Sequence, residues 1–179
     1  MKNTIKLISV FACVILLLNG CKKDGPVTLD SIPPTLTLTI QGGGETYTLR
    51  HTEDYTLGAL NLKPNTKYTI NCVAADSGGV LLSQLTLPKL LMPQTITGIP
   101  NDTVYNTSLN YSYRVNISES DPYKSTLLFG DFVTPTTGNG SSSFSIAAVA
   151  KDFRYNRSAI SFYTNVESNP VGGYGWVAY

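Results

Sequence analysis

The sequence predicts an all-β protein with an antiparallel sandwich fold. Apolar and polar residues alternate along most of the chain after residue 34, which is typical of strands that bury one face. Clusters of Gly, Asp, Asn and Pro separate these segments at short intervals, as turns between antiparallel strands do. No segment combines a helical apolar stripe with a capping residue. These three observations favour packed antiparallel sheets.

The first expected strand covers residues 35–40, where threonines alternate with leucine and isoleucine. Three glycines then interrupt the pattern, and residues 47–49 form a short second candidate. Residues 61–66, with the sequence NLKPNT, indicate a turn-rich approach to the next strand, and Asp76 to Gly79 indicate a turn after it. The remaining strands are expected at 68–75, 80–87, 109–117, 126–133, 142–150 and 159–166.

One pattern occurs twice. Residues 68–76 and 144–152 both read aromatic, small polar, Ile, two small or polar residues, Val, Ala, any residue and Asp. Two tandem domains would explain the repeat, but neither half reaches the roughly 100 residues and seven strands of a sandwich. We therefore expect one domain in which the two segments are paired central strands.

The first 20 residues have the composition of an export signal. Lys2 and Lys6 precede an apolar run over residues 7–18, which is too short to cross a bilayer core that takes roughly 20 residues. The next residues, Leu18-Asn19-Gly20-Cys21, resemble the lipobox of bacterial lipoproteins. An ordinary secretory signal followed by an unrelated cysteine is the alternative.

The lipobox resemblance implies a lipid anchor. In that family the cysteine sulfur receives a diacylglycerol, the signal is removed and the new N-terminus is acylated, so residues 1–20 would be lost and Cys21 lipidated. Residues 21–34 then form a polar, proline-containing tether, similar to the spacers of bacteroidete-type lipoproteins. The expected location is the outer membrane, on the cell surface or the periplasmic face, with the lipid as the contact to the membrane.

Further segments resemble bacterial immunoglobulin-like domains. The resemblance implies strands B and C around Asp76 and strands F and G around Asp152, in one domain over residues 35–168. Residues 169–179, rich in Gly and aromatics, would add a tail or an edge strand. The segments concerned are Ile32-Pro33-Pro34, Ala75-Asp76-Ser77-Gly78-Gly79-Val80, Ala150-Lys151-Asp152 and Asn156-Arg157-Ser158.

Processing changes the charge and the cysteine inventory. Loss of Lys2 and Lys6 leaves 11 basic and 12 acidic side chains, a formal net charge of −1. Cys13 leaves with the signal and Cys21 is lipidated, so Cys72 has no partner for an internal disulfide. The immunoglobulin-like resemblance sets Ala148 opposite Cys72, and we expect a buried, unreactive thiol. A reactive or metal-binding thiol is the alternative.

The sequence lacks the residues that several classes of function require. The near-neutral charge gives no general reason to expect nucleic acid as a partner. The single histidine, His51, excludes a multi-histidine metal site, and its acidic neighbours Glu53 and Asp54 read as a solvated cluster; a hydrolase built on it is the weakest hypothesis. Asp76 and Asp152 are expected to cap turns, with calcium binding as the alternative. We therefore expect no catalytic residues, no metal and no cofactor.

The aromatic residues, among them 11 Tyr and one Trp, are the remaining candidates for a ligand-binding site. Flat aromatic faces bind the apolar C–H faces of sugar rings. Tyr111 and Tyr113 share one strand face, and Tyr174 and Trp176 alternate near the C-terminus, so these four are the candidate ligand-binding residues. Tyrosine is also an ordinary strand residue, and the last segment could simply form an edge strand.

Two further sites and two functions follow. The tripeptides at 30–32 and 102–104 resemble bacteroidete O-glycosylation sites, with Ser31 and Thr103 as acceptors. The first functional hypothesis is a lipid-anchored envelope binding module, with glycans of a polysaccharide-uptake system as its ligands. The second is a structural or assembly protein that contacts an envelope protein through an exposed sheet edge.

Overall fold

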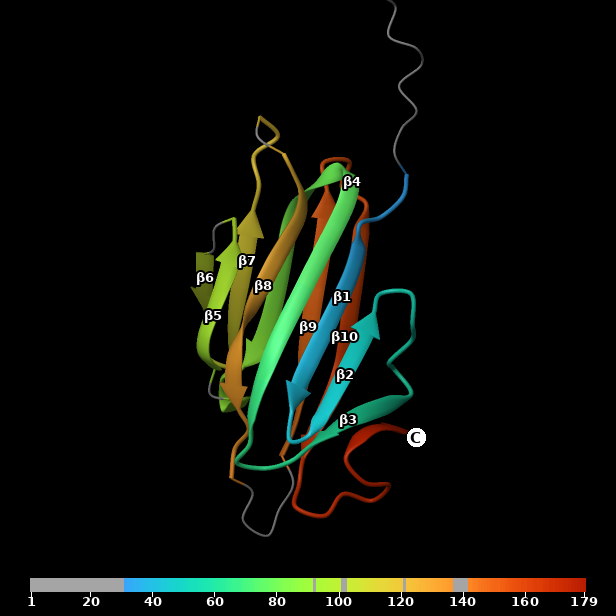
Figure 1. The fold of residues 1–179 in the computed structure, drawn as a ribbon, viewed down its shortest axis with the longest axis vertical. Coiled ribbons are helices and arrows are strands. Elements are labelled where there is room, and N and C mark those ends of the chain that lie inside the picture. Colours follow the sequence, from blue (N-terminus) through green and yellow to red (C-terminus); the bar gives the residue numbers. More distant parts are fainter. Residues whose placement is uncertain (1–30, 92, 101–102, 121, 137–141) are drawn as a thin grey trace, which may run out of the picture. The chain divides into compact units, whose positions relative to one another are not determined.

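The computed structural model describes residues 31–91, 93–100, 103–120, 122–136 and 142–179 (Figure 1). Ser31–Tyr179 cluster into one compact unit. The predicted signal over residues 1–20, Cys21 and residues 22–30 of the predicted tether lie outside the described residues. Among those that are described, no helix is long and apolar enough to span a membrane.

The all-β prediction is confirmed, because strands and one short 3-10 helix make up the regular structure of the described residues. The strands belong to a single 11-stranded sheet. The elements are β1 (Thr35–Gly42), β2 (Glu45–Arg50), β3 (Gly58–Leu62), β4 (Lys67–Pro88), η1 (Lys89–Leu91), β5 (Pro93–Ile99), β6 (Thr103–Asn106), β7 (Asn110–Asn116), β8 (Tyr123–Val133), β9 (Ser142–Asp152), β10 (Arg157–Val166) and β11 (Gly175–Ala178).

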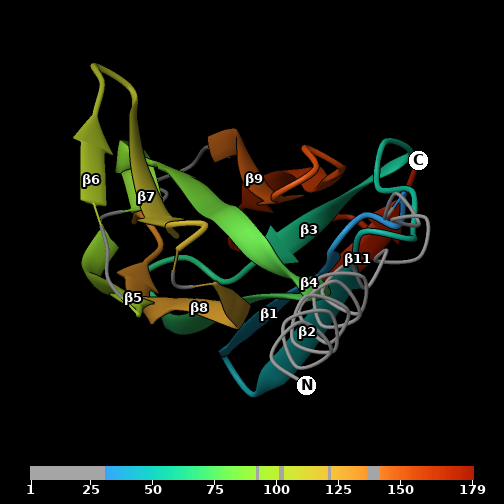
Figure 2. The same ribbon diagram turned by 90° about the horizontal axis from the view of Figure 1, so that it is seen from above.

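Strand β4, with 22 residues, organises the sheet. Its first half pairs with β1 and β8, and its second half pairs with β7 and β9. The sheet therefore has two arms that share β4. The first arm runs β2-β1-β4-β8-β5, and the second runs β11-β3-β10-β9-β4-β7-β6 (Figures 1 and 2).

The predicted turn at residues 76–79 is a bend inside β4, so the expectation of two separate strands is wrong. The Asp76 Oδ1 accepts the Gly78 N–H at 2.7 Å, and Gly79 adopts a positive φ of 102°. The register to β8 shifts between Ala75 and Val80. Extra residues at such a bulge bend a strand without ending it, and here they redirect β4 from one arm to the other.

Two predictions about pairing are also wrong. The sheet is mixed, because β3 runs parallel to β10, from Ala59 opposite Tyr163 to Leu62 opposite Val166. The two repeat segments do not pair with each other either. Residues 68–75 pair with β1 and β8, whereas β9 pairs with β10 and with the second half of β4. The bend in β4 gives the first repeat segment different neighbours from those the pattern suggests.

The core is one apolar cluster with contributions from both arms. Every second residue is buried from Leu36 to Ile40 of β1, from Ile146 to Asp152 of β9 and throughout β10, as the alternation predicts. Cys72 belongs to this core with no exposed surface, so its predicted burial is confirmed. Desolvation raises the pKa of its thiol to about 12.

Candidate functional site

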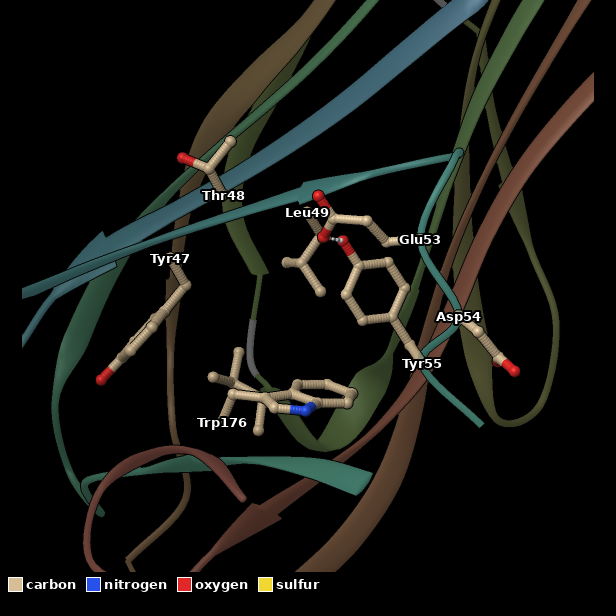
Figure 3. Close-up of a pocket in the computed structure, with 8 residues that line it drawn as sticks. Tyr47, Thr48, Leu49, Glu53, Asp54, Tyr55 and Trp176 are labelled. Atoms are coloured by element: carbon tan, nitrogen blue, oxygen red, sulfur yellow. Dashed lines mark hydrogen bonds between the residues drawn. The ribbon is translucent and has the colours of Figure 1, made fainter. Parts of the chain in front are cut away.

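A cavity of about 320 Å³ opens where the two arms end (Figure 3). Its walls come from β2, the terminal strand of the first arm, from the loop that follows β2, and from β3 and β11 at the end of the second arm. The lining residues are Tyr47, Thr48, Leu49, Glu53, Asp54, Tyr55, Leu60 and Trp176.

Trp176 forms one wall of the cavity. It lies on β11 opposite Leu60 of β3 and keeps 39% of its surface exposed. Its ring meets Tyr55 edge-on, with centroids 5.1 Å apart, and Phe162 in the same way at 6.5 Å. A Cβ at Gly58 would lie 2.8 Å from the indole Cζ2. The absence of a side chain at residue 58 therefore lets the indole lie close to the β3 backbone.

Tyr55 is held rigidly although it comes from a loop. Its hydroxyl donates to the Glu53 Oε2 at 2.6 Å and accepts the Arg50 N–H at 2.7 Å. Desolvation, followed by the bond to Glu53, raises the pKa of Tyr55 to about 12, and desolvation does the same for Tyr47. Both phenols are therefore neutral at physiological pH.

The floor is apolar and the rim is acidic. Leu49 and Leu60 are 3% and 1% exposed. The Glu53 Oε1 lies 3.5 Å from the Arg50 Nη1, and both side chains are about half exposed. The Asp54 Oδ1 accepts the N–H and hydroxyl of Thr56, which lowers the pKa of Asp54. In Figure 3 Glu53 lies beside the Tyr55 hydroxyl, whereas the Asp54 carboxylate points outward.

His51 has a different position from its acidic neighbours. The ring Nδ1 of His51 accepts the backbone N–H of Leu36 at 3.0 Å, and the backbone N–H of His51 donates to the Leu36 carbonyl at 3.1 Å. These bonds attach the end of β2 to the start of β1. His51 is not among the lining residues, so the residues 51–54 do not converge on one point.

The other predicted ligand-binding residues lie apart from the cavity. The Tyr174 hydroxyl donates to the Ser168 carbonyl at 2.6 Å, and the Lys63 Nζ lies 5.3 Å from the ring centroid. Tyr113 is 7% exposed in the core, and the Lys89 Nζ lies 5.1 Å from the centroid of Tyr111. Of the four candidates, the structure brings only Trp176 into the cavity.

The remaining predicted positions are at the surface or in turns. Ser31 and Thr103 are exposed, at the start of the described chain and at the start of β6. The Asp152 Oδ1 accepts the N–H groups of Arg154 and Asn156, both at 2.8 Å, which caps the turn between β9 and β10. Within the described part of the chain, no three His, Cys, Asp or Glu residues are grouped as a metal site would require.

No protein-family model matches the chain, and no curated protein matches it. Sequence reasoning missed Tyr47 and Tyr55 and treated Glu53 and Asp54 as merely solvated. The available signal was the position of the two tyrosines on either side of the only acidic pair in that region.

Proposed function

We propose that this chain is an exported, lipid-anchored binding module of a bacterial cell envelope and that its cavity holds a sugar ring of a glycan. The observation that carries the proposal is that three aromatic rings, from Tyr47, Tyr55 and Trp176, line one cavity with an apolar floor. The aromatic rings and the hydrogen-bond acceptors that a sugar requires line the same cavity.

The chemistry of the walls suits a sugar. Its C–H faces pack against aromatic rings by dispersion, and its hydroxyls donate hydrogen bonds to carboxylate and hydroxyl oxygens. Here Glu53 supplies such oxygens beside the rings, whereas the Thr48 side chain lies on the other face of β2 (Figure 3). The volume of about 320 Å³ suits a monosaccharide-sized group.

We also infer an immunoglobulin-like sandwich. Its two sheets have the strand orders A-B-E-D and C-F-G. The order β1-β4-β8-β5 in the first arm supports the former, and β4-β9-β10 in the second arm supports the latter. In this assignment β4 supplies both B and C, and the hairpin at Asp152 joins F to G.

The lipobox-like sequence at Cys21 supports the anchor, and the tether supports placement at the outer membrane. Labelling cells with a radioactive fatty acid tests this: the chain should carry label, and Cys21→Ala should not. Label retained by Cys21→Ala would contradict the anchor without affecting the cavity.

A glycan array with the detergent-purified full-length chain tests the ligand class. Because Trp176 is the only tryptophan, its fluorescence reports directly on the cavity during titration with each hit. For the variants, isothermal titration calorimetry replaces the fluorescence, because Trp176→Ala removes the reporter. We expect Trp176→Ala to reduce the affinity at least about tenfold and Tyr163→Ala to leave it unchanged, because Tyr163 is exposed on β10 away from the cavity lining. A chain that binds no polysaccharide would refute the glycan proposal.

One observation favours a second function, the binding of an envelope protein. Within the described chain, β2 pairs only with β1, so its outer edge is open to strand addition. A photo-crosslinker at the exposed Thr46 tests this, because a stoichiometric envelope protein captured there would support it.

A further inference from the structure

We propose that the group held in the cavity carries a positive charge, so that the module prefers glycans with a free amine to neutral glycans of the same backbone. This inference rests on the proposed function and names the ligand class of the same site.

The charges of the cavity lining are of one sign. Glu53 and Asp54 contribute two carboxylates, and no Lys or Arg is among the lining residues. Arg50 offsets part of the Glu53 charge at 3.5 Å, but its side chain is 60% exposed and lies outside the lining. Asp54 points outward, so it adds negative potential at the mouth and Glu53 is the carboxylate that can contact a ligand (Figure 3).

The aromatic walls of the cavity also favour a positively charged ligand. The face of an aromatic ring carries partial negative charge and attracts a cation, most strongly where water is partly excluded. Tyr47, Tyr55 and Trp176 surround the cavity, and the two phenols are neutral. Aromatic rings combined with nearby carboxylates form the kind of site that recognises ammonium groups.

Elsewhere on the described surface, tyrosine rings have cations from the protein itself. Lys63, Lys89 and Arg114 lie over Tyr174, Tyr111 and Tyr105, at 5.3, 5.1 and 4.6 Å from the ring centroids. No such internal cation is found over the three rings of the cavity in the described residues. The cavity therefore offers the same interaction to a cation from outside.

Three tetrasaccharides with the same β-1,4-linked glucose backbone test the inference. They carry a hydroxyl (cellotetraose), an acetamide (tetra-N-acetylchitotetraose) or an ammonium group (chitosan tetraose) at carbon 2. Each is titrated into the detergent-purified full-length chain, below the pKa of the amine, while Trp176 fluorescence is recorded. We expect the amine to bind about tenfold more tightly than the hydroxyl compound, and we expect salt to reduce that difference.

Amide variants separate charge from structure. Glu53→Gln and Asp54→Asn keep an acceptor for the Tyr55 hydroxyl and for Thr56, but remove the charge. Glu53→Gln should abolish most of the preference for the amine, so that chitosan tetraose and cellotetraose bind with nearly equal affinity, with a smaller effect for Asp54→Asn. Glu45→Gln is the matched control, because Glu45 is exposed on β2 and does not line the cavity.

The outcomes distinguish the two proposals. Equal affinity for the three compounds would overturn the inference and leave glycan binding intact. A preference for the amine that survives in the Glu53→Gln and Asp54→Asn double variant would also overturn it, because the cation would then be held elsewhere. If none of the three binds and the glycan array is silent as well, both proposals fail.

Discussion

Gly58→Ala is expected to displace the indole of Trp176 and to lower stability. The new Cβ would lie 2.7 Å from the Val177 carbonyl oxygen and 2.8 Å from the indole Cζ2, both closer than carbon atoms tolerate. β3 is buried along its whole length, whereas β11 is a four-residue terminal strand, so β11 is the element that yields. The contact of Trp176 with Tyr55 would then open.

The cost follows from overpacking, typically about 1–3 kcal/mol, which includes loss of an edge-on aromatic pair of about 0.5–1.5 kcal/mol. For a domain of this size we expect a fall in Tm of about 2–4 °C for each kcal/mol. Thermal unfolding gives the stability, and the emission maximum of the single tryptophan gives the exposure of the indole, which should shift to the red.

Gly44→Ala is the control for this substitution. A Cβ at Gly44 meets no atom within 4 Å, so that variant can lose stability through its φ of 89° but should leave the emission unchanged. If Gly58→Ala has the emission maximum and Tm of the parent chain, the reasoning that Gly58 positions the indole is refuted.

Three further predictions concern the body of the fold. Asp152→Ala should destabilise the domain by about 2–4 kcal/mol in denaturant unfolding, since the buried Asp152 accepts three hydrogen bonds in the β9–β10 turn, whereas Asp152→Asn should cost less. Cys72 should resist thiol reagents in the native chain and react after denaturation, and mass spectrometry that finds rapid native labelling would contradict its burial. Hydrogen bonds from Lys67 and from the Thr69 hydroxyl lower the pKa of Asp131. The ion pair therefore stabilises the fold above the ordinary aspartate pKa, and this stabilisation is lost as the pH falls through the lowered pKa. Asp131→Asn should reduce Tm at neutral pH but not in strong acid.

The alternation of apolar and polar residues predicted the strands that have one buried and one exposed face. It did not predict strands that are buried on both faces. β1, β9 and β10 were predictable because every second residue enters the core. β3 was not, because all five residues of GALNL are buried and no alternation exists. Its parallel pairing with β10 depends on tertiary contacts that no local pattern encodes.

The candidate site was predictable only in part, for a similar reason. Trp176 could be singled out as the one tryptophan in a glycine-rich segment. Its companions Tyr47 and Tyr55 lie more than 100 residues earlier in the chain. They meet Trp176 because the two arms end beside each other, and this depends on the bend in β4 rather than on any motif.

The continuous course of β4 also affects how the domain unfolds. Both arms take backbone hydrogen bonds from this one strand, so neither can lose its central member while the other keeps its own. Amide protons on both sides of Gly79 should therefore exchange with solvent at a common, global opening, whereas those of the terminal strands β2 and β11 exchange earlier through local fraying. The cavity lies between those two terminal strands, so a ligand that bridges them would slow exchange at both ends of the sheet at once.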